Sequence, residues 1–201
     1  MVSNYLEASI LALIQGFSEF IPVSSSAHLI LVSKISSFNL GSLQLDICLH
    51  LGSLIAILFY FKKDIINLFQ NRPLVVLLIL GSVPLVIIGF FQVLAIIPGV
   101  SRAGITITAS RLLNFNRVDS SKIAFYLSIP ALSGASVLGI KDLFEENIKF
   151  DLVFIFATFL SFVFSYLTIK YFLIFVKKFS LKFFVYYRIF LALILFYIIY
   201  F

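Results

Sequence analysis

Few ionisable side chains lie within the apolar stretches of this chain, and these few mark where chemistry could occur. Glu19, His28 and Arg102 each stand in a segment that is otherwise largely hydrophobic. Because charged side chains are costly in apolar surroundings, such residues are candidates for function. A carboxylate and an imidazole suit proton transfer or metal chelation, and a guanidinium suits anion binding. His50 stands alone, and we interpret it as a structural, interhelical residue.

The first cluster combines a carboxylate, hydroxyl groups and an imidazole. Gln15 and Glu19 are four residues apart and therefore share one helix face. Pro22 predicts the end of that helix, because the residue before a proline disfavours the helical conformation. Three serines at 24–26 are favoured caps for a new half-helix, which would carry His28. The segment therefore predicts a helix break surrounded by reactive groups.

The second cluster has the features of an anion site. Residues 98–106 read PGVSRAGIT, in which Gly99 and Gly104 allow backbone N–H groups to approach an anion closely. A helix that starts here would direct its N-terminal amides and positive dipole end to the same place. Arg102 binds phosphate oxygens in a fork geometry. The segment predicts a phosphate site.

The composition requires a membrane environment. Of 201 residues, 62% are hydrophobic and 12% are charged, with a mean hydropathy of +1.14. Soluble domains carry about 25% charged residues, so a soluble globule and a disordered chain are both excluded. At about 20 residues a span, the chain holds roughly six to eight membrane segments. The strongest apolar runs cover 45–61, 74–91, 123–140, 152–176 and 183–201.

Weaker apolar stretches contain the two clusters. Polar residues and prolines interrupt residues 5–35 and 93–113, which predicts broken or re-entrant helices that line protein or a wet cavity. Residues 22–28 and 98–104 also align without gaps and share a proline, a serine and an alanine. We therefore predict an all-α polytopic membrane protein, one domain over 1–201, built as a pseudo-symmetric inverted repeat with halves of roughly 1–72 and 73–201.

The charges indicate orientation rather than a nucleic-acid partner. The net charge is +6, but the basic residues gather in short clusters between apolar runs. The positive-inside rule places the clusters at 62–72, 111–122 and 177–182 in the cytoplasm and the acidic segment 141–151 outside. Cys48 is the single cysteine, which excludes an intramolecular disulfide and a cysteine-based metal site.

Both clusters resemble motifs of the undecaprenyl-diphosphate phosphatase family, the bacitracin-resistance type of bacterial membrane phosphatase. The matching stretches are 15–28 (QGFSEFIPVSSSAH) and 98–106 (PGVSRAGIT). Residues 49–53 (LHLGS) resemble the family's next helix, 128–131 (SIPA) the helix after the arginine motif, and 187–188 (YR) the final helix. The resemblance runs along most of the chain.

The resemblance implies an enzyme that hydrolyses undecaprenyl diphosphate, an isoprenoid diphosphate lipid, to the monophosphate that carries cell-wall precursors. It implies a divalent cation such as Mg²⁺, with Glu19 as a ligand, and a pocket in the bacterial inner membrane that opens toward the periplasm. Glu19 matches the family's essential acidic residue, with Gln15 as its permitted partner. The other matching positions are Ser24, Ser25 and His28 in the first motif, and Ser101, Arg102 and Thr106 in the second.

In this interpretation Arg102 and nearby amides clamp the phosphates, and Glu19 orients the nucleophile directly or through a metal. His28 is a candidate general acid/base or nucleophile, and Ser25 is the alternative nucleophile. The residues do not choose between direct attack by water and a phospho-enzyme. Apolar helices beside the site would hold the isoprenoid tail.

The sequence departs from the family in three places. Ala103 stands where serine is usual, and Ala27 where glycine is frequent. Near residues 88–92 the chain passes directly into the arginine motif, where typical members carry an additional helix and loops. The alternatives are a lipid-phosphate or small-anion transporter, a non-catalytic membrane scaffold and an inactive shortened relative. Convergence of Glu19, His28 and Arg102 at one site would favour the enzyme.

Overall fold

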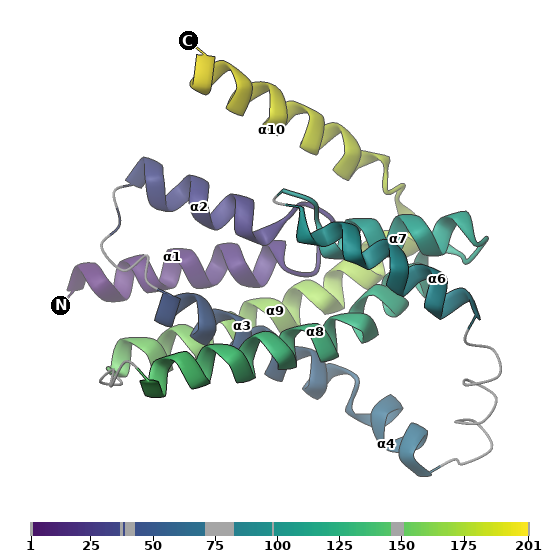
Figure 1. The fold of residues 1–201 in the computed structure, drawn as a ribbon, viewed down its shortest axis with the longest axis horizontal. Helices are drawn as coiled ribbons and strands as arrows, with labels where there is room; N and C mark the ends of the chain where they lie inside the picture. Colours follow the sequence, from purple (N-terminus) through teal and green to yellow (C-terminus); the bar gives the residue numbers. More distant parts are fainter. Residues whose placement is uncertain are drawn as a thin grey trace.

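The computed structural model describes residues 2–36, 38, 43–70, 83–97, 99–145 and 151–200, and all regular elements among them are helical (Figure 1). In chain order the helices are α1 (Val2–Ser18), α2 (Ser25–Ser36), α3 (Leu43–Tyr60), α4 (Lys62–Gln70), α6 (Val83–Gln92), the 3₁₀ helix η1 (Val93–Ile96), α7 (Arg102–Leu112), α8 (Arg117–Glu145), α9 (Leu152–Lys178) and α10 (Lys182–Tyr200). The predicted all-α class is confirmed.

Three of these helices are long and apolar enough to cross a membrane: Leu43–Tyr60, Arg117–Lys141 and Leu152–Lys178. They contain the predicted runs 45–61, 123–140 and 152–176 almost entirely. The run 183–201 forms α10. The first half of the run 74–91 lies outside the described residues, and the second half belongs to the short apolar helix α6. The chain is a polytopic helical membrane protein; the inverted repeat stays a prediction.

Helix α9 is the element against which the others assemble, because α1 and α3 both pack along it and α8 packs on α3 (Figure 1). Two glycines permit these close approaches. A Cβ at Gly52 would stand 2.4 Å from the Thr158 carbonyl oxygen, and one at Gly16 would stand 2.6 Å from the Phe164 Cβ. Small residues at helix contacts of this kind are typical of membrane proteins. Hydroxyl groups add to the α3–α9 contact, as Ser161 donates to the Leu49 carbonyl oxygen at 2.6 Å.

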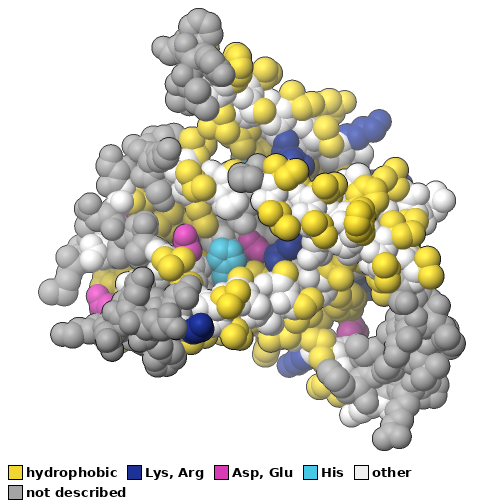
Figure 2. Space-filling model, viewed as in Figure 1, with side chains coloured by type: hydrophobic (Ala, Val, Ile, Leu, Met, Phe, Trp, Pro, Cys, Tyr) yellow, Lys and Arg dark blue, Asp and Glu magenta, His cyan; other side chains and the backbone are white. Residues whose placement is uncertain are grey.

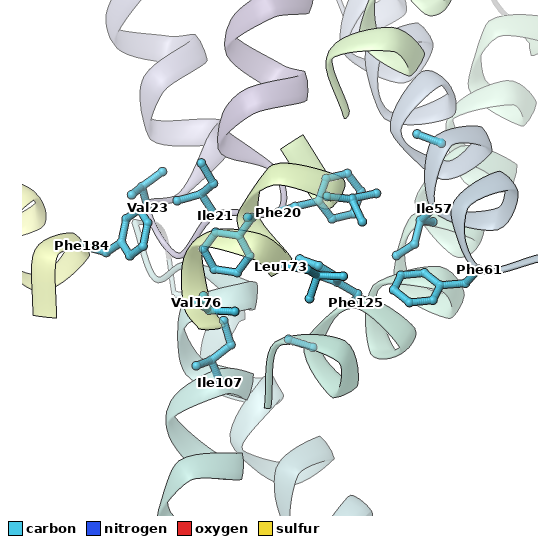
Figure 3. Close-up of a cluster of buried hydrophobic side chains, with 14 of the residues drawn as sticks. Phe20, Ile21, Val23, Ile57, Phe61, Ile107, Phe125, Leu173, Val176 and Phe184 are labelled. Carbon is cyan, nitrogen blue, oxygen red and sulfur yellow. The ribbon is translucent and has the colours of Figure 1, made fainter. Parts of the chain in front are cut away.

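A cluster of buried apolar side chains fixes the first helix break to the rest of the molecule (Figure 3). Phe20, Ile21 and Val23 come from the segment between α1 and α2. They pack with side chains of α3, α7, α8, α9 and α10, among them Phe125 and Phe184. Phe20 and Phe125 meet edge to face, with ring centroids 5.4 Å apart. Burial of this turn makes it a rigid platform for the residues it carries.

The broken segments form two helical hairpins. Helix α1 packs on α2, and α6 packs on α7, and in Figure 1 the turns of both hairpins lie side by side. The predicted break at Pro22 is confirmed, but α1 ends earlier, at Ser18, and residues 19–23 form turns. A proline excludes the helical conformation most strongly at the residue before it, and here the aromatic and aliphatic residues ahead of Pro22 leave the helix to enter the core.

One predicted loop is a helix. The basic segment 62–72 was expected to connect two spans, but its first nine residues form α4. Ile65 packs against the core cluster while Lys62, Lys63 and Asp64 are exposed, so the segment is amphipathic and follows the core surface. Arg72 lies outside the described residues, as does part of the acidic segment 141–151.

Candidate active site

The turn between α1 and α2 carries the first set of predicted site residues. The Glu19 amide donates to the Gln15 carbonyl oxygen at 2.9 Å, which continues the helical path of α1 by one residue. Ser24 then adopts the left-handed conformation, with φ of 71°, and α2 begins at Ser25. This reversal places the Ser25 hydroxyl within hydrogen-bond distance of the Glu19 carboxylate.

The turn before α7 carries the second set. Gly99 has φ of +86°, a conformation that a side chain rarely adopts. Ser101 is extended and caps α7, because its Oγ accepts from the Gly104 amide at 3.1 Å. The predicted helix start in this segment is confirmed, with Arg102 as the first helical residue. Pro98 lies outside the described residues.

The two turns meet in a buried ion pair. Arg102 Nη2 lies 2.5 Å from Glu19 Oε1, and the Glu19 side chain is only 5% exposed. The other carboxylate oxygen, Oε2, accepts from Ser25 Oγ at 2.6 Å and from Gln15 Nε2 at 3.1 Å. Three donors thus stabilise the charged form of the carboxylate. The guanidinium keeps further N–H groups for a ligand, because its side chain is 23% exposed.

A cavity of about 240 Å³ opens beside this ion pair. Polar side chains of both turns form one wall, and small apolar residues of α8 contribute to the rest. Its lining consists of Ser18, Glu19, Ser24, Ser25, Ser26, His50, Ala95, Val100, Ser101, Arg102, Ala131, Leu132 and Ala135. Figure 2 shows a histidine with acidic and basic side chains gathered near the middle of one face, among hydrophobic atoms. We call this space the active-site cavity.

The N-termini of two helices border the active-site cavity. Helix α2 begins at Ser25 and α7 begins at Arg102, and both of these residues are in the lining. Each N-terminus has unpaired amides and a positive dipole end, which favour an anion. The charge of Arg102 is offset by its ion pair with Glu19, so what the site offers to negative oxygens is the two sets of N-terminal amides and the remaining N–H groups of the guanidinium.

His28 has a different position from the one that convergence of the three ionisable residues would require. Its Nδ1 lies 2.7 Å from the Ser24 carbonyl oxygen, and its Nε2 lies 2.7 Å from the Tyr187 hydroxyl on α10. Both ring nitrogens are thus engaged, and His28 is not among the cavity-lining residues. Glu19 and Arg102 are therefore in contact at the cavity. His28 instead contacts the Ser24 carbonyl oxygen in the turn between α1 and α2 and the Tyr187 hydroxyl of α10.

His50 was interpreted as a structural residue, yet it lines the active-site cavity. Its Nδ1 lies 2.7 Å from the Asp46 carbonyl oxygen one turn earlier in α3. This contact orients the ring, and the described residues provide no hydrogen-bond partner for Nε2. A lone histidine carries little signal by itself, and only the resemblance of residues 49–53 to a family motif pointed to this helix. No role was predicted for Tyr187 either, although residues 187–188 resemble the family's final helix.

Three other predicted site residues face the protein. The Thr106 hydroxyl donates to the carbonyl oxygens of Arg102 at 2.9 Å and Ala103 at 3.1 Å, and the residue is fully buried. The Gly104 amide is used by the Ser101 cap. Gln15 is also fully buried and reaches the site through its contact with Glu19. Gly99 does not line the cavity, and its part is to shape the turn.

Glu19 is the carboxylate of the active-site cavity lining that could hold a divalent cation. Among the residues that the structure describes, no three histidine, cysteine, aspartate or glutamate side chains gather into a metal site. Both oxygens of Glu19 also accept hydrogen bonds, from Arg102, Ser25 and Gln15 Nε2. Mg²⁺ can bind through one protein carboxylate and complete its shell with water and phosphate oxygens, so a cation would bind here together with a phosphorylated ligand.

Fold and site define a polytopic helical membrane protein with a cavity lined by polar side chains between two helix breaks. The chain belongs to the family of the bacitracin resistance protein BacA, whose sequence pattern matches residues 8–90 and 80–194.

Similar proteins from several bacteria are named undecaprenyl-diphosphatase. The chain is 44% identical to the undecaprenyl-diphosphatase of Pelagibacter ubique, with 100% of each chain covered. It is 33% identical to the undecaprenyl-diphosphatase of Elusimicrobium minutum, and the alignment covers 94% of this chain and 96% of the other. It is 31% identical to the undecaprenyl-diphosphatase of Alcanivorax borkumensis, and that alignment covers 96% of this chain and 98% of the other.

The alignment to the Pelagibacter protein extends over 255 positions while this chain has 201 residues, so that relative has residues without a counterpart here. The two matched family segments overlap at residues 80–90. This overlap is close to residues 88–92, where the sequence predicts that a helix and loops of typical family members are missing.

Proposed function

We propose that this chain hydrolyses undecaprenyl diphosphate to undecaprenyl phosphate and inorganic phosphate, and thereby recycles the lipid carrier for peptidoglycan synthesis. The observation that carries the proposal is the contact of Arg102 and Ser25 with one buried carboxylate, Glu19, at a cavity bordered by two helix N-termini. Such a site can bind a diphosphate and activate a nucleophile at the same place. Membership of the BacA family supports the proposal.

Arg102 and the N-terminal amides of α7 and α2 bind the diphosphate. The transition state of phosphoryl transfer is loose, with little bonding to the attacking and leaving oxygens. Catalysis therefore depends on positioning the reactants and on neutralising the charge of the phosphate oxygens. A guanidinium at the start of a helix supplies both a fork of donors and a favourable field. Arg102 is held in place by its ion pair with Glu19.

Ser25 is the nucleophile that the geometry favours. Its Oγ donates to Glu19 Oε2 at 2.6 Å, the arrangement of a hydroxyl and its general base. Oγ attacks the terminal phosphorus, its proton passes to Glu19, and the bond between this phosphorus and the bridging oxygen breaks. Glu19 gives this proton to the bridging oxygen of the leaving undecaprenyl phosphate and is a carboxylate again. Water, deprotonated by Glu19, then attacks the phosphoserine, and Glu19 returns that proton to Ser25 Oγ as inorganic phosphate is released.

His28 is a positioning residue in this mechanism. A carbonyl oxygen can only accept, so the Nδ1 that faces Ser24 carries a proton, and in the neutral ring Nε2 accepts from the Tyr187 hydroxyl. These two contacts connect the left-handed Ser24 to α10. The imidazole thereby keeps the neighbouring Ser25 hydroxyl in register with Glu19 rather than transferring a proton itself.

Glu19 would hold a divalent cation, for which we propose Mg²⁺. Bound with the substrate, it would neutralise negative charge on the diphosphate oxygens. Substrate and water would supply the remaining ligands of Mg²⁺.

We propose that the chain resides in the bacterial inner membrane with the active-site cavity open to the periplasm. The basic segments at 111–122 and 177–182 support this orientation through the positive-inside rule. The partners are then the lipid bilayer and the isoprenoid diphosphate that it contains, and no nucleic acid is involved.

The first experiment measures phosphate release from undecaprenyl diphosphate by the purified chain in detergent with Mg²⁺. Release by the wild type, and a loss of about a thousandfold or more in Arg102→Ala, is expected because the variant lacks the phosphate clamp. Lys63→Ala is the control, since this exposed lysine of α4 lies outside the cavity lining. No release by folded wild-type protein would overturn the proposal and favour a transporter or an inactive shortened relative.

A further inference from the structure

A second cavity, of about 310 Å³, lies between α7 and the first turns of α10, and it shares no lining residue with the active-site cavity. Four of its lining residues are basic and none is acidic. We call it the basic cavity and define it by Arg111, Arg117, Lys182 and Arg188. Basic side chains are visible beside α10 in Figure 2.

The four positive charges have no counter-charge in the described part of the chain. Arg111 donates to the Phe115 carbonyl oxygen at 2.5 Å, and Arg117 donates to the Phe179 carbonyl oxygen at 2.6 Å. Each contact satisfies one N–H group and leaves the charge in place. None of the four forms an ion pair with a described carboxylate. Like charges in one cavity repel each other, and an anion bound among them would relieve that repulsion.

The shape of the cavity also favours a ligand with negative oxygens. Arg188 Nη1 lies 3.3 Å from the point where a Cβ at Gly104 would stand, so the glycine lets the guanidinium lie against the start of α7. Ile107 and Phe184 are buried apolar residues in the same wall. Guanidinium groups beside apolar walls lose less of their attraction to solvent screening than exposed charges do.

We propose that the basic cavity is a second anion site, which binds a phosphate group carried by an anionic phospholipid or present as inorganic phosphate. Arginine forks match the geometry of phosphate oxygens. Basic pockets between membrane helices bind anionic lipid headgroups when they face the cytoplasm, the side predicted for segments 111–122 and 177–182. The site is independent of hydrolysis at Glu19, because the two cavities are lined by different residues.

The test uses the full chain, purified in a neutral detergent and stripped of lipid. Native mass spectrometry counts bound phosphatidylglycerol against phosphatidylcholine, and calorimetric titration measures binding of inorganic phosphate. The wild type is compared with Arg111→Gln/Arg188→Gln. The matched control is Lys177→Gln/Lys178→Gln, which removes the same charge from the neighbouring basic segment outside the cavity lining. Each basic group contributes about fivefold, so the double variant, which lacks two of them, should bind about twenty-five-fold more weakly.

The two arms distinguish the sources of the phosphate group. Preference for phosphatidylglycerol without binding of inorganic phosphate supports a lipid headgroup, and binding of inorganic phosphate that the double variant loses supports the free ion. Lys182→Glu places a carboxylate in the cavity and keeps the contact of the backbone amide at 182 with Ser180 Oγ. This variant should lose binding even if the double variant fails to fold. Equal binding of both lipids together with no phosphate binding overturns the proposal, as does equal loss in the lysine control.

Discussion

In the proposed mechanism, the contact between Ser25 and Glu19 activates the nucleophile. Because Ser25 Oγ is 2.6 Å from the carboxylate, we expect Ser25→Ala to lower phosphate release by about a thousandfold or more, as the loss of an activated nucleophile does. Ser26→Ala is the control, since Ser26 lines the same cavity and, among the described residues, its hydroxyl has a hydrogen bond with the Ser24 hydroxyl alone, at 3.4 Å. Its rate should stay within about threefold of the wild type.

A phosphoserine at position 25 is the direct evidence for this route. It should be detectable by mass spectrometry after acid quenching of the wild-type enzyme during turnover, because hydrolysis of the intermediate is a separate step. If Ser25→Ala keeps more than a tenth of the activity and no phosphoserine forms, water attacks the substrate directly and Glu19 acts on that water.

His28 and Tyr187 make a prediction that separates positioning from proton transfer. Tyr187→Phe removes the hydroxyl that lies 2.7 Å from His28 Nε2, and should lower the free energy of unfolding by about 1 kcal/mol. Activity should stay within about tenfold of the wild type, with an unchanged dependence of kcat on pH, because His28 transfers no proton. Thermal unfolding and pH–rate profiles check both statements. A displaced pH profile in Tyr187→Phe would instead assign acid/base catalysis to His28.

At the scale of the elements, the α3–α9 contact depends on glycine. Gly52→Ala would place a Cβ 2.4 Å from the Thr158 carbonyl oxygen and 2.7 Å from the Ser161 Cβ, so the two helices would have to separate. Overpacking of this kind costs about 1–3 kcal/mol or more, and we expect a lower yield of folded protein and a lower Tm. Gly89→Ala is the matched control, since no atom lies within 4 Å of its added Cβ. Equal Tm values for the two variants would contradict this account of the packing.

The helical elements and their broken segments were predictable because they depend on local patterns. Long apolar runs identified α3, α8 and α9, and the interruptions at 22–28 and 98–104 located both turns. Glu19 and Arg102, 83 residues apart, were expected at one site and lie in contact there. That expectation came from shared chemistry at two helix breaks and from a family resemblance.

The roles of single polar side chains were harder to predict, because they depend on helix phase and on tertiary partners. Thr106 bonds to its own helix, and its identity alone did not indicate this. His28 faces Tyr187, a partner 159 residues away that no local pattern signals. His50 reaches the cavity only because α3 packs where it does. The left-handed Ser24 likewise follows from the way the buried turn is held.

For the whole molecule, the shortened length leaves the site itself intact. Both site-forming motifs are present, and the hairpins that carry them pack in the described structure although the Pelagibacter relative has residues without a counterpart here. The helices that hold α1 and α7 in place are α9 and α8, which come after the predicted point of shortening. The residues that this chain lacks relative to the Pelagibacter protein are therefore not needed for the contact between Glu19 and Arg102 in this structure.

An apolar cavity of about 470 Å³ between α1, α9 and α10 is a candidate site for the isoprenoid tail of the proposed substrate. Phe17 and Ile21, on either side of Glu19 in the sequence, line it together with aromatic residues of α9.

Phe17→Ala should raise KM for undecaprenyl diphosphate by about tenfold, the effect of losing one buried aromatic contact. KM for farnesyl diphosphate, whose short tail makes fewer such contacts, should change much less. The control is Phe90→Ala, because this exposed residue of α6 is outside the cavity lining. Steady-state kinetics on both substrates provide the test. An equal rise in KM for both substrates would mean that Phe17 acts on the site of hydrolysis. No rise in KM for undecaprenyl diphosphate would place the tail elsewhere.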